Sequence, residues 1–388
     1  MRASRLFLIL WLGVISGSTL VPVGGVEQVP SFFCVLCGHG AVADILLNVA
    51  LFLPLGLALS ADGWRPLRAL TLGAAFSLAI EIAQFAIPGR DPSLSDVLSN
   101  TLGTALGIGL VRSARVWWRP GPRLANALAI AAAVAAAGVL VSTGALFAPS
   151  FPEDTYYAGW TPRFGHLAWY GGRVQEVALD DFPLPEGRIA ASAQVRQHLA
   201  LPYVLVVRAR AGPHPAGLAP LFTINDRHTR EIVLVGVRGD DLVYRYRTRA
   251  VAWGLRAPAI RVRGALRDVA AQSPLLITVR RTSSTYCLTV NTAERCGLGH
   301  TPGGAWALVL GGQPIPIWLQ PALPIVWLAA LFVPIGLWAR LDLASALAIA
   351  LPLATAILLA PPVETLGAVA GLVAGGLSAH ARLKSGAP

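Results

Sequence analysis

Long apolar segments occupy both ends of this 388-residue chain, and eight of them have nearly the length that a helix needs to cross a bilayer, about 20 residues. They lie at about 5–23, 42–60, 68–87, 95–112, 124–147, 317–339, 343–360 and 364–380. The pattern predicts a polytopic α-helical membrane protein with about eight transmembrane helices. The last two segments would also fit one re-entrant hairpin around Pro361 and Pro362.

Between the fifth and sixth segments the hydrophobic pattern changes from continuous to alternating. Short runs such as PYVLVVRARA, EIVLVGV and LLITVRR alternate apolar and polar residues, as strands with one buried face do. Turn-forming sequences such as GPHPAG and RGDD separate these runs, which indicates an antiparallel β-sandwich. The chain is therefore predicted to divide into membrane helices over 1–149, an inserted all-β domain over 150–315, and membrane helices over 316–388.

The composition agrees with a membrane protein. Hydrophobic residues make up 55% of the chain and charged residues only 13%, with a mean hydropathy of +0.60, whereas about a quarter of a typical soluble chain is charged. The formal net charge is +11, but no basic run with interleaved aromatic residues accompanies it. We therefore expect the lipid bilayer, and no nucleic acid, as a partner.

The placement of Lys and Arg predicts the orientation of the helices, because short cytoplasmic loops carry an excess of both. One side of the predicted membrane receives Arg2, Arg5, Arg65, Arg68, Arg112, Arg115, Arg119, Arg123, Arg340, Arg382 and Lys384. The short loops of the other side hold only Arg90. The chain is thus predicted to lie in the cytoplasmic (inner) membrane with both termini cytoplasmic and residues 150–315 extracytoplasmic.

Polar side chains recur at helical spacing inside three of the apolar segments. Each segment carries two of them three or four positions apart, which places both on one helix face. The pairs are Asp44 with Asn48, Glu81 with Gln84, and Asp96 with Asn100. All three lie near the predicted outer face, beside the loop that carries Arg90 and Asp91. Polar groups inside a membrane are candidates for function, although they also serve simply to join helices by hydrogen bonds.

These residues are predicted to form one polar cluster, in which Asp44, Glu81 and Asp96 approach one another. Four carboxylates, counting Asp91, would repel one another if all were ionised with only Arg90 nearby. A proton, a cation or a cationic ligand is therefore expected in the cluster.

The order of these motifs resembles a known membrane family. The series D-x-x-x-N, F-x-P-x-G, E-x-x-Q and D-x-x-x-N-x-x-G, which begins here at Asp44, Phe52, Glu81 and Asp96, is similar to the hallmark of VanZ-like proteins. The resemblance implies a link to glycopeptide antibiotic tolerance but no defined reaction. It also implies that the first helix is retained, although a cleaved signal peptide would fit the basic and apolar N-terminus as well. The β segment resembles a concanavalin A-like (laminin G-type) jelly roll.

Two motifs of the first helices return near the C-terminus. ALFLPLGL (50–57) returns as ALFVPIGL (330–337), and NTLGTALG (100–107) returns as ETLGAVAG (364–371). Spans six to eight are therefore predicted to be a degenerate copy of spans two to four in parallel orientation. Leu328 stands at the place of Asn48, and nothing in 343–360 replaces Glu81 or Gln84, so the second copy would keep the scaffold without the chemistry.

The four cysteines fall into two pairs. Cys287 and Cys296 flank the predicted hairpin YCLTVNTAERCG, where an oxidising compartment favours a disulfide. Cys34 and Cys37 lie in CVLCG ahead of the second span. They are predicted to be either a disulfide or two reduced thiols, because a zinc site would need further ligands.

No metal or cofactor is predicted. Asp226, Asp240 and Asp241 are the candidates if the sandwich holds calcium. The sandwich contains no G-x-S-x-G and no H-E-x-x-H motif, so no hydrolase of those types is indicated.

Three functions are compatible with these features. We favour a non-enzymatic envelope protein that binds a glycan, peptidoglycan or an amphiphilic, lipid-linked ligand through the sandwich and the polar cluster. The alternatives are a membrane enzyme that acts on a lipid-linked or peptidoglycan substrate, with Glu81, Asp91 or Asp96 as acid or base, and a small-molecule or proton-coupled transporter.

Overall fold

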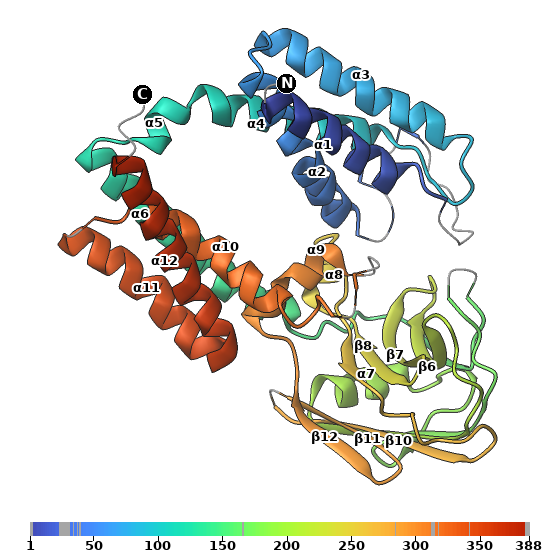
Figure 1. The fold of residues 1–388 in the computed structure, drawn as a ribbon. Helices are drawn as coiled ribbons and strands as arrows, with labels where there is room; N and C mark the ends of the chain where they lie inside the picture. The colour runs from blue at the N-terminus through green and yellow to red at the C-terminus, as the bar shows by residue number, and fades with distance from the viewer. Residues whose placement is uncertain are drawn as a thin grey trace.

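Two groups of helices and one β-sandwich make up the protein, as the computed structural model in Figure 1 shows. The structure describes residues 3–22, 32–33, 35–36, 38, 40–164, 167–283, 285–311, 315–316, 318–340 and 342–384. The sandwich lies against the same end of both helical groups (Figure 1). The chain enters the sandwich from a helix of the second group and returns to that group afterwards.

Each predicted apolar segment contains one long helix. These are α1 (Ala3–Thr19), α2 (Ala41–Ala61), α3 (Pro66–Gln84), α4 (Leu94–Arg112), α6 (Pro122–Phe147), α10 (Leu323–Trp338), α11 (Leu343–Leu359) and α12 (Pro362–Lys384), with a short α5 (Ala114–Trp118) before α6. Among the described residues, α2, α3, α4, α6 and α12 are long and apolar enough to cross a membrane, whereas α1, α10 and α11 are shorter. The prediction of a multi-pass membrane protein is confirmed, and the number of eight spans stays a prediction.

Helices α2 and α4 approach so closely that only glycine fits between them, and α10 and α12 do the same. A Cβ atom on Gly107 would lie 2.1 Å from the carbonyl oxygen of Leu53, and one on Gly375 would lie 2.3 Å from that of Val333. Small residues that allow such backbone contact are typical of helix pairs in membranes. The two helix pairs therefore use the same packing device.

The contacts also show which residues of the two pairs correspond. The match of 50–57 with 330–337 places Val333 at the position of Leu53, so Gly375 takes the place of Gly107. The sequence match of 100–107 with 364–371 would instead pair Gly107 with Gly371. The contact register of α12 is therefore displaced by four residues, or one helical turn, from that match.

A further helix completes the second group in a way that the sequence comparison did not predict. The apolar core of α1 to α4 includes Phe52 and Leu55, and that of the second group includes Phe332 and Ile335 at the corresponding positions. The second core also includes Ala133 and other residues of α6. Helix α11 packs mainly against α6, whereas α3 packs mainly against α4. The second group is thus α6 with α10, α11 and α12.

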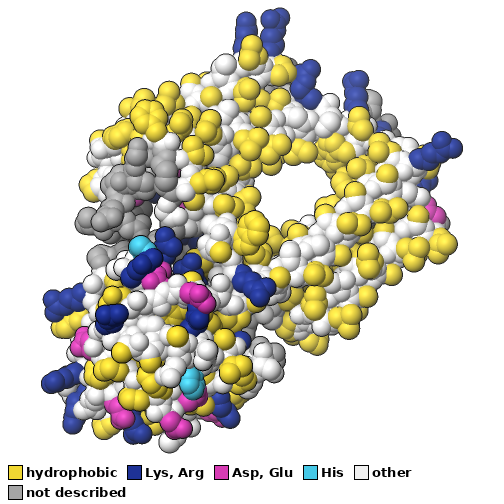
Figure 2. Space-filling model, turned by 180° about the vertical axis from the view of Figure 1, so that it is seen from behind, with side chains coloured by type: hydrophobic (Ala, Val, Ile, Leu, Met, Phe, Trp, Pro, Cys, Tyr) yellow, Lys and Arg dark blue, Asp and Glu magenta, His cyan; other side chains and the backbone are white. Residues whose placement is uncertain are grey.

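The surface of the helical part is mostly hydrophobic, and its basic side chains gather at one edge. Figure 2 shows Lys and Arg along the edge of the helices that faces away from the sandwich. An opening between the two helical groups is rimmed by hydrophobic side chains (Figure 2). Apolar surface of this kind is expected to contact lipid rather than water.

The sandwich consists of two six-stranded antiparallel sheets. One sheet has the order β4 (Gly187–Arg188), β1 (Tyr156–Trp160), β6 (Ala219–Asp226), β7 (Glu231–Arg238), β8 (Asp241–Tyr246) and β9 (Ile260–Val262). The other has the order β12 (Ala293–Leu298), β11 (Tyr286–Val290), β10 (Pro274–Arg281), β5 (Tyr203–Arg210), β2 (Arg173–Leu179) and β3 (Phe182–Pro183). Helices α7 (Ser192–Ala200), α8 (Arg249–Ala252) and α9 (Ala307–Leu310) and the 3-10 helix η1 (Pro302–Trp306) accompany the sheets.

The alternation that predicted the strands reflects burial between the sheets. In β5, for example, Leu205, Val207 and Ala209 are buried, and the residues between them are less so. Side chains with this period of two stand on one face of a strand and fill the core. The predicted β-sandwich is confirmed, and its jelly-roll type stays a prediction.

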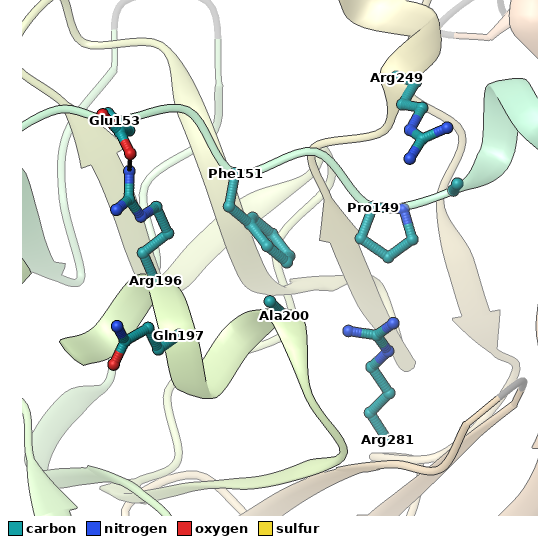
Figure 3. Close-up of a pocket in the computed structure, with 9 residues that line it drawn as sticks. Pro149, Phe151, Glu153, Arg196, Gln197, Ala200, Arg249 and Arg281 are labelled. Carbon is teal, nitrogen blue, oxygen red and sulfur yellow. Dashed lines mark ion pairs between the residues drawn. The ribbon is translucent and has the colours of Figure 1, made fainter. Parts of the chain in front are cut away.

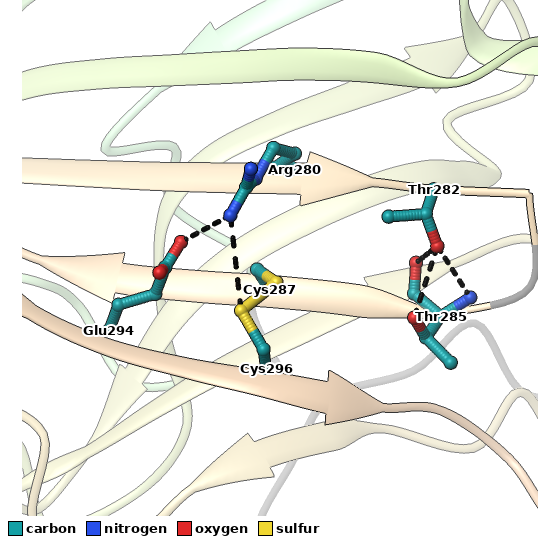
Figure 4. Close-up of a disulfide and its surroundings, with 6 residues drawn as sticks. All are labelled: Arg280, Thr282, Thr285, Cys287, Glu294 and Cys296. Carbon is teal, nitrogen blue, oxygen red and sulfur yellow. Dashed lines mark hydrogen bonds and ion pairs between the residues drawn. A yellow bond between two sulfur atoms is a disulfide. The ribbon is translucent and has the colours of Figure 1, made fainter.

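One disulfide joins β11 to β12, between Cys287 and Cys296 (Figure 4). Arg280 of the neighbouring β10 forms an ion pair with Glu294 at 2.7 Å beside it. Because both sulfurs are in the disulfide, neither is a free thiolate for a metal ion. Cys34 and Cys37 lie outside the described residues.

The three aspartates considered for calcium do not form one site. Asp226 ends β6, where its carboxylate accepts backbone hydrogen bonds from His228 at 2.9 Å and Arg230 at 2.8 Å. Asp240 and Asp241 lie at the other end of β7. The described contacts of these two carboxylates are with basic side chains and backbone N–H groups. Asp240 Oδ1 lies 2.7 Å from His214 Nδ1, and Asp241 forms an ion pair with Arg261.

Candidate functional site

The three predicted polar pairs lie on α2, α3 and α4 at the end of the helical group that faces the sandwich. Asp44 is in the first turn of α2 and Asp96 in the first turn of α4. Glu81 is in the last turn of α3, which runs in the opposite direction. Short connections between antiparallel helices place these turns at one level.

Asp44, Asn48 and Asp96 form the part of the cluster between α2 and α4. The side chain of Asn48 lies near enough to the carboxylate of Asp96 to stabilise its charge. The carboxylates of Asp44 and Asp96 are close enough for their charges to interact. The backbone N–H of Asp96 donates to Ser93 Oγ at 3.1 Å, so Ser93 caps the start of α4.

A positive charge from the sandwich compensates this part of the cluster. Arg256 Nη2 lies 2.6 Å from Asp44 Oδ1. The carbonyl of nearby Gly254 accepts hydrogen bonds from the backbone N–H groups of Val42 at 3.0 Å and Ala43 at 3.1 Å. These N–H groups belong to the first turn of α2, which has no partners for them within the helix. The loop after α8 thus both caps α2 and supplies the arginine.

This arginine corrects the expectation that only Arg90 would face the carboxylates. Arg90 donates hydrogen bonds to the carbonyl oxygens of Ser18 at 2.7 Å and Val21 at 2.9 Å, at the end of α1. Its charge acts on Glu81, but its hydrogen bonds hold α1 to the loop between α3 and α4. The sequence carries no signal for Arg256, which lies 212 residues from Asp44.

Glu81 is the most deeply buried carboxylate of the cluster, with 2% of the residue exposed. Its Oε2 accepts a hydrogen bond from the backbone N–H of Ser93 at 2.7 Å, and its charge also acts on Asp96. Glu81 therefore joins the end of α3 to the residue that caps α4. The sequence signal for Ser93 is the pattern Ser-x-x-Asp ahead of an apolar run, which is typical of a helix start.

The remaining predicted residues are spread around this centre. Gln84 Nε2 donates to the carbonyl of Thr19 at 3.0 Å, and Asn100 Nδ2 donates to Ser77 Oγ at 2.9 Å. The other amide atom of Asn100, Oδ1, is buried and has no hydrogen-bond partner in the described structure. Asp91 is exposed. Gln84 thus serves as a joint between helices, whereas Asn100 retains an unused acceptor.

The arrangement suits recognition of a polar group at the boundary between the two domains. The Asp44 side chain is 46% exposed and that of Arg256 25% exposed, so both are accessible from outside the bundle. Together they present a carboxylate and a planar guanidinium, already paired with each other, at this boundary. Within the described residues, no three His, Cys, Asp or Glu side chains of these helices come close enough to hold one metal ion.

Comparison with known proteins agrees with the helical part of this description. No curated protein and no solved structure matches the chain. Residues 8–117 match the model of the VanZ/LLP1 family, and this range contains every residue of the polar cluster except Arg256. The first helical group is therefore a VanZ-like domain of a multi-pass membrane protein, joined to a β-sandwich that supplies one residue of its polar cluster.

Proposed function

We propose that this chain is an envelope protein that binds an amphiphilic ligand where the VanZ-like helices meet the sandwich. The observation that carries the proposal is the ion pair between Asp44 and Arg256, because it makes one half-exposed polar site from both domains. The polar part of the ligand, a glycan or another headgroup, would contact these two residues and Asp96. Its apolar part would lie along the lipid-facing helices.

The second helical group supports a binding role for the cluster over a packing role. Helices α10 and α12 reach the same close backbone contact with buried Leu328 and Ala368 at the positions of Asn48 and Asn100. Polar side chains are therefore not needed for this packing. Their presence in the first group calls for another explanation, and ligand binding provides one.

We further propose that the sandwich lies outside the cytoplasm. The basic edge of the helices faces away from it (Figure 2), as the excess of Lys and Arg in cytoplasmic loops would require. A reporter that is active only outside the cytoplasm, fused after Ser150, should be active. Activity of a cytoplasm-specific reporter at that position would contradict the orientation and the placement of the site.

Glycopeptide susceptibility provides the functional test. The full chain, expressed in a susceptible host, should raise the concentration of a glycopeptide antibiotic that stops growth. Asp44→Asn and Arg256→Gln should each remove most of this increase, whereas Glu364→Gln in the second helical group should keep it. Equal loss in all three variants at equal protein levels would mean that the polar cluster has no specific role.

The enzyme alternative predicts a different result at Glu81. Glu81→Gln keeps the shape of the side chain and removes its titration, so it should abolish acid–base catalysis. In a binding protein, Glu81→Gln should reduce the increase in glycopeptide tolerance at most severalfold. The reason is that the Glu81 carboxylate already accepts a hydrogen bond from the Ser93 backbone, which the glutamine carbonyl can also accept. Complete loss of function in a stably folded Glu81→Gln protein would favour the enzyme.

A further inference from the structure

A pocket of about 510 Å³ lies where the chain leaves α6 and enters the sandwich. It shares no residue with the polar cluster. The segment that follows α6, helix α7, the start of α8 and the end of β10 form its walls. Figure 3 shows Arg249 and Arg281 extending toward Pro149 from opposite sides, with Phe151 beside them.

The charge of this pocket is strongly positive. Three arginines and one acidic residue line it: Arg196, Arg249, Arg281 and Glu153. Glu153 is already paired with Arg196, at 2.7 Å. The guanidinium of Arg249 makes no hydrogen bond or ion pair in the described structure. Two positive charges in the pocket therefore have no acidic partner among the residues that line it.

Arg281 is held in position by a hydrogen bond to the backbone. Its Nη1 donates a hydrogen bond to the carbonyl of Leu199 at 2.7 Å, at the end of α7. Burial raises the pKa of the nearby Tyr203, Tyr246 and Tyr286 phenols still further above their usual range, so these side chains place no negative charge beside the guanidinium. The guanidinium is thus oriented by a neutral acceptor and keeps donors for another group.

The pocket lies at the end of a membrane helix. Ala148, which lines it, directly follows the last residue of α6, a helix long and apolar enough to cross a membrane. The backbone N–H of Arg249 donates to the carbonyl of Ala148 at 2.9 Å, which fixes the start of α8 to this point. Farther along α6, Val141 is 60% exposed. At the end of a membrane-spanning helix, the charged headgroups of the bilayer meet its apolar chains.

From this combination we propose that the pocket binds the phosphate group of an anionic ligand, between Arg249 and Arg281. The planar guanidinium matches a phosphate with two parallel hydrogen bonds, and such charge-assisted bonds are the stronger ones. A lipid headgroup and a soluble phosphate compound share this chemistry. The apolar surface of α6 below the pocket suits the acyl chains of a lipid. The inference does not depend on the function proposed for the polar cluster.

The test uses the full chain in detergent and measures binding of two probes, a short-chain phosphatidylglycerol and inorganic phosphate. Short-chain phosphatidylcholine, which has no net charge, is the reference. Arg249→Gln should weaken phosphatidylglycerol binding roughly tenfold, because the charge-assisted hydrogen bonds of the guanidinium to the phosphate are lost and glutamine replaces them by a neutral one at most. Arg281→Gln should do the same. Arg188→Gln, which removes an exposed arginine of β4 outside the pocket, should change binding less than twofold.

The results distinguish a site for a lipid headgroup from a site for any phosphate compound, and both from the absence of a specific site. Loss of phosphatidylglycerol binding alone in Arg249→Gln identifies a lipid headgroup site, and parallel loss of phosphate binding identifies a general phosphate site. Binding that is no tighter than that of phosphatidylcholine would overturn the proposal. An equal effect of Arg188→Gln would also overturn it, because attraction would then come from overall charge. Arg249 makes no side-chain bonds in the described structure, so its variant remains informative if Arg281→Gln does not fold.

Discussion

The helix pairs α2/α4 and α10/α12 have the same backbone packing and different side-chain chemistry. In each pair, glycine allows a backbone contact that a Cβ atom would prevent, as at Gly107 and Gly375. Asn48 and Asn100 of the first pair correspond to Leu328 and Ala368 of the second. The comparison separates the residues that close packing requires, which are the glycines, from those that it does not require, which are the amides.

One acidic position is present in both pairs but has different partners. By the contact register, Glu364 of α12 takes the place of Asp96 of α4. Asp96 interacts with the side chain of Asn48 of the neighbouring helix. Glu364 instead accepts hydrogen bonds from Thr301 Oγ1 at 2.7 Å and the Gly303 backbone at 3.2 Å, in the segment that leaves the sandwich. The same helix turn therefore serves a polar cluster in one group and a domain connection in the other.

The largest effect is expected at the glycines. Gly107→Ala and Gly375→Ala should each lower the free energy of unfolding by about 3 kcal/mol, because the added methyl group forces the two helices apart. Thermal unfolding in detergent would measure the loss. Gly109→Ala and Gly376→Ala are matched controls, because a Cβ at either position meets no atom within 4 Å. A tolerated Gly375→Ala with a disruptive Gly107→Ala would contradict the equivalence of the two pairs.

The exchange of polar and apolar residues should be asymmetric. Leu328→Asn places an amide without a partner at a fully buried position and should cost about 2 kcal/mol. Asn48→Leu should cost at most about 1 kcal/mol, because interhelical hydrogen bonds in membranes contribute little and leucine already serves in the second pair. Asn48→Leu should nevertheless lose the increase in glycopeptide tolerance. If Asn48→Leu keeps that function, the amide of Asn48 has no functional role.

The smallest effect concerns the contacts of each pair with the sandwich. Arg256→Gln should lower stability by at most about 1 kcal/mol, because the ion pair with Asp44 is partly exposed and screened by solvent. Arg256→Gln should have a clearer local effect: the backbone amides of Val42 and Ala43 at the start of α2 should exchange their hydrogens faster. Thr301→Ala should leave those amides unchanged and loosen the start of α12 instead. Identical exchange patterns in both variants would mean that the two connections are not independent.

Local patterns predicted most of the elements. The length of the apolar segments predicted the long helices, and period-two alternation predicted β5 and β10 of the sandwich. The strand β7 is instead a continuous apolar run that is buried along nearly its whole length. The spacing of Asp44 with Asn48 and of Asp96 with Asn100 predicted shared helix faces. These properties are visible in sequence because each one repeats within a few residues of the chain.

Only the tertiary structure decided how these elements combine. The contact of Arg256 with Asp44 joins residues 212 positions apart, and no local pattern encodes a pairing between a sandwich loop and a helix end. The register of α12 depends on which glycine meets Val333, and apolar stretches of Ala, Leu and Gly match equally well one turn apart. Helix α6 joins the second group because its small side chains fit against α10 and α11. The sequence shows which residues are apolar and therefore buried. It does not show which helices and strands pack together, because that depends on the shapes of surfaces that meet only in the folded chain.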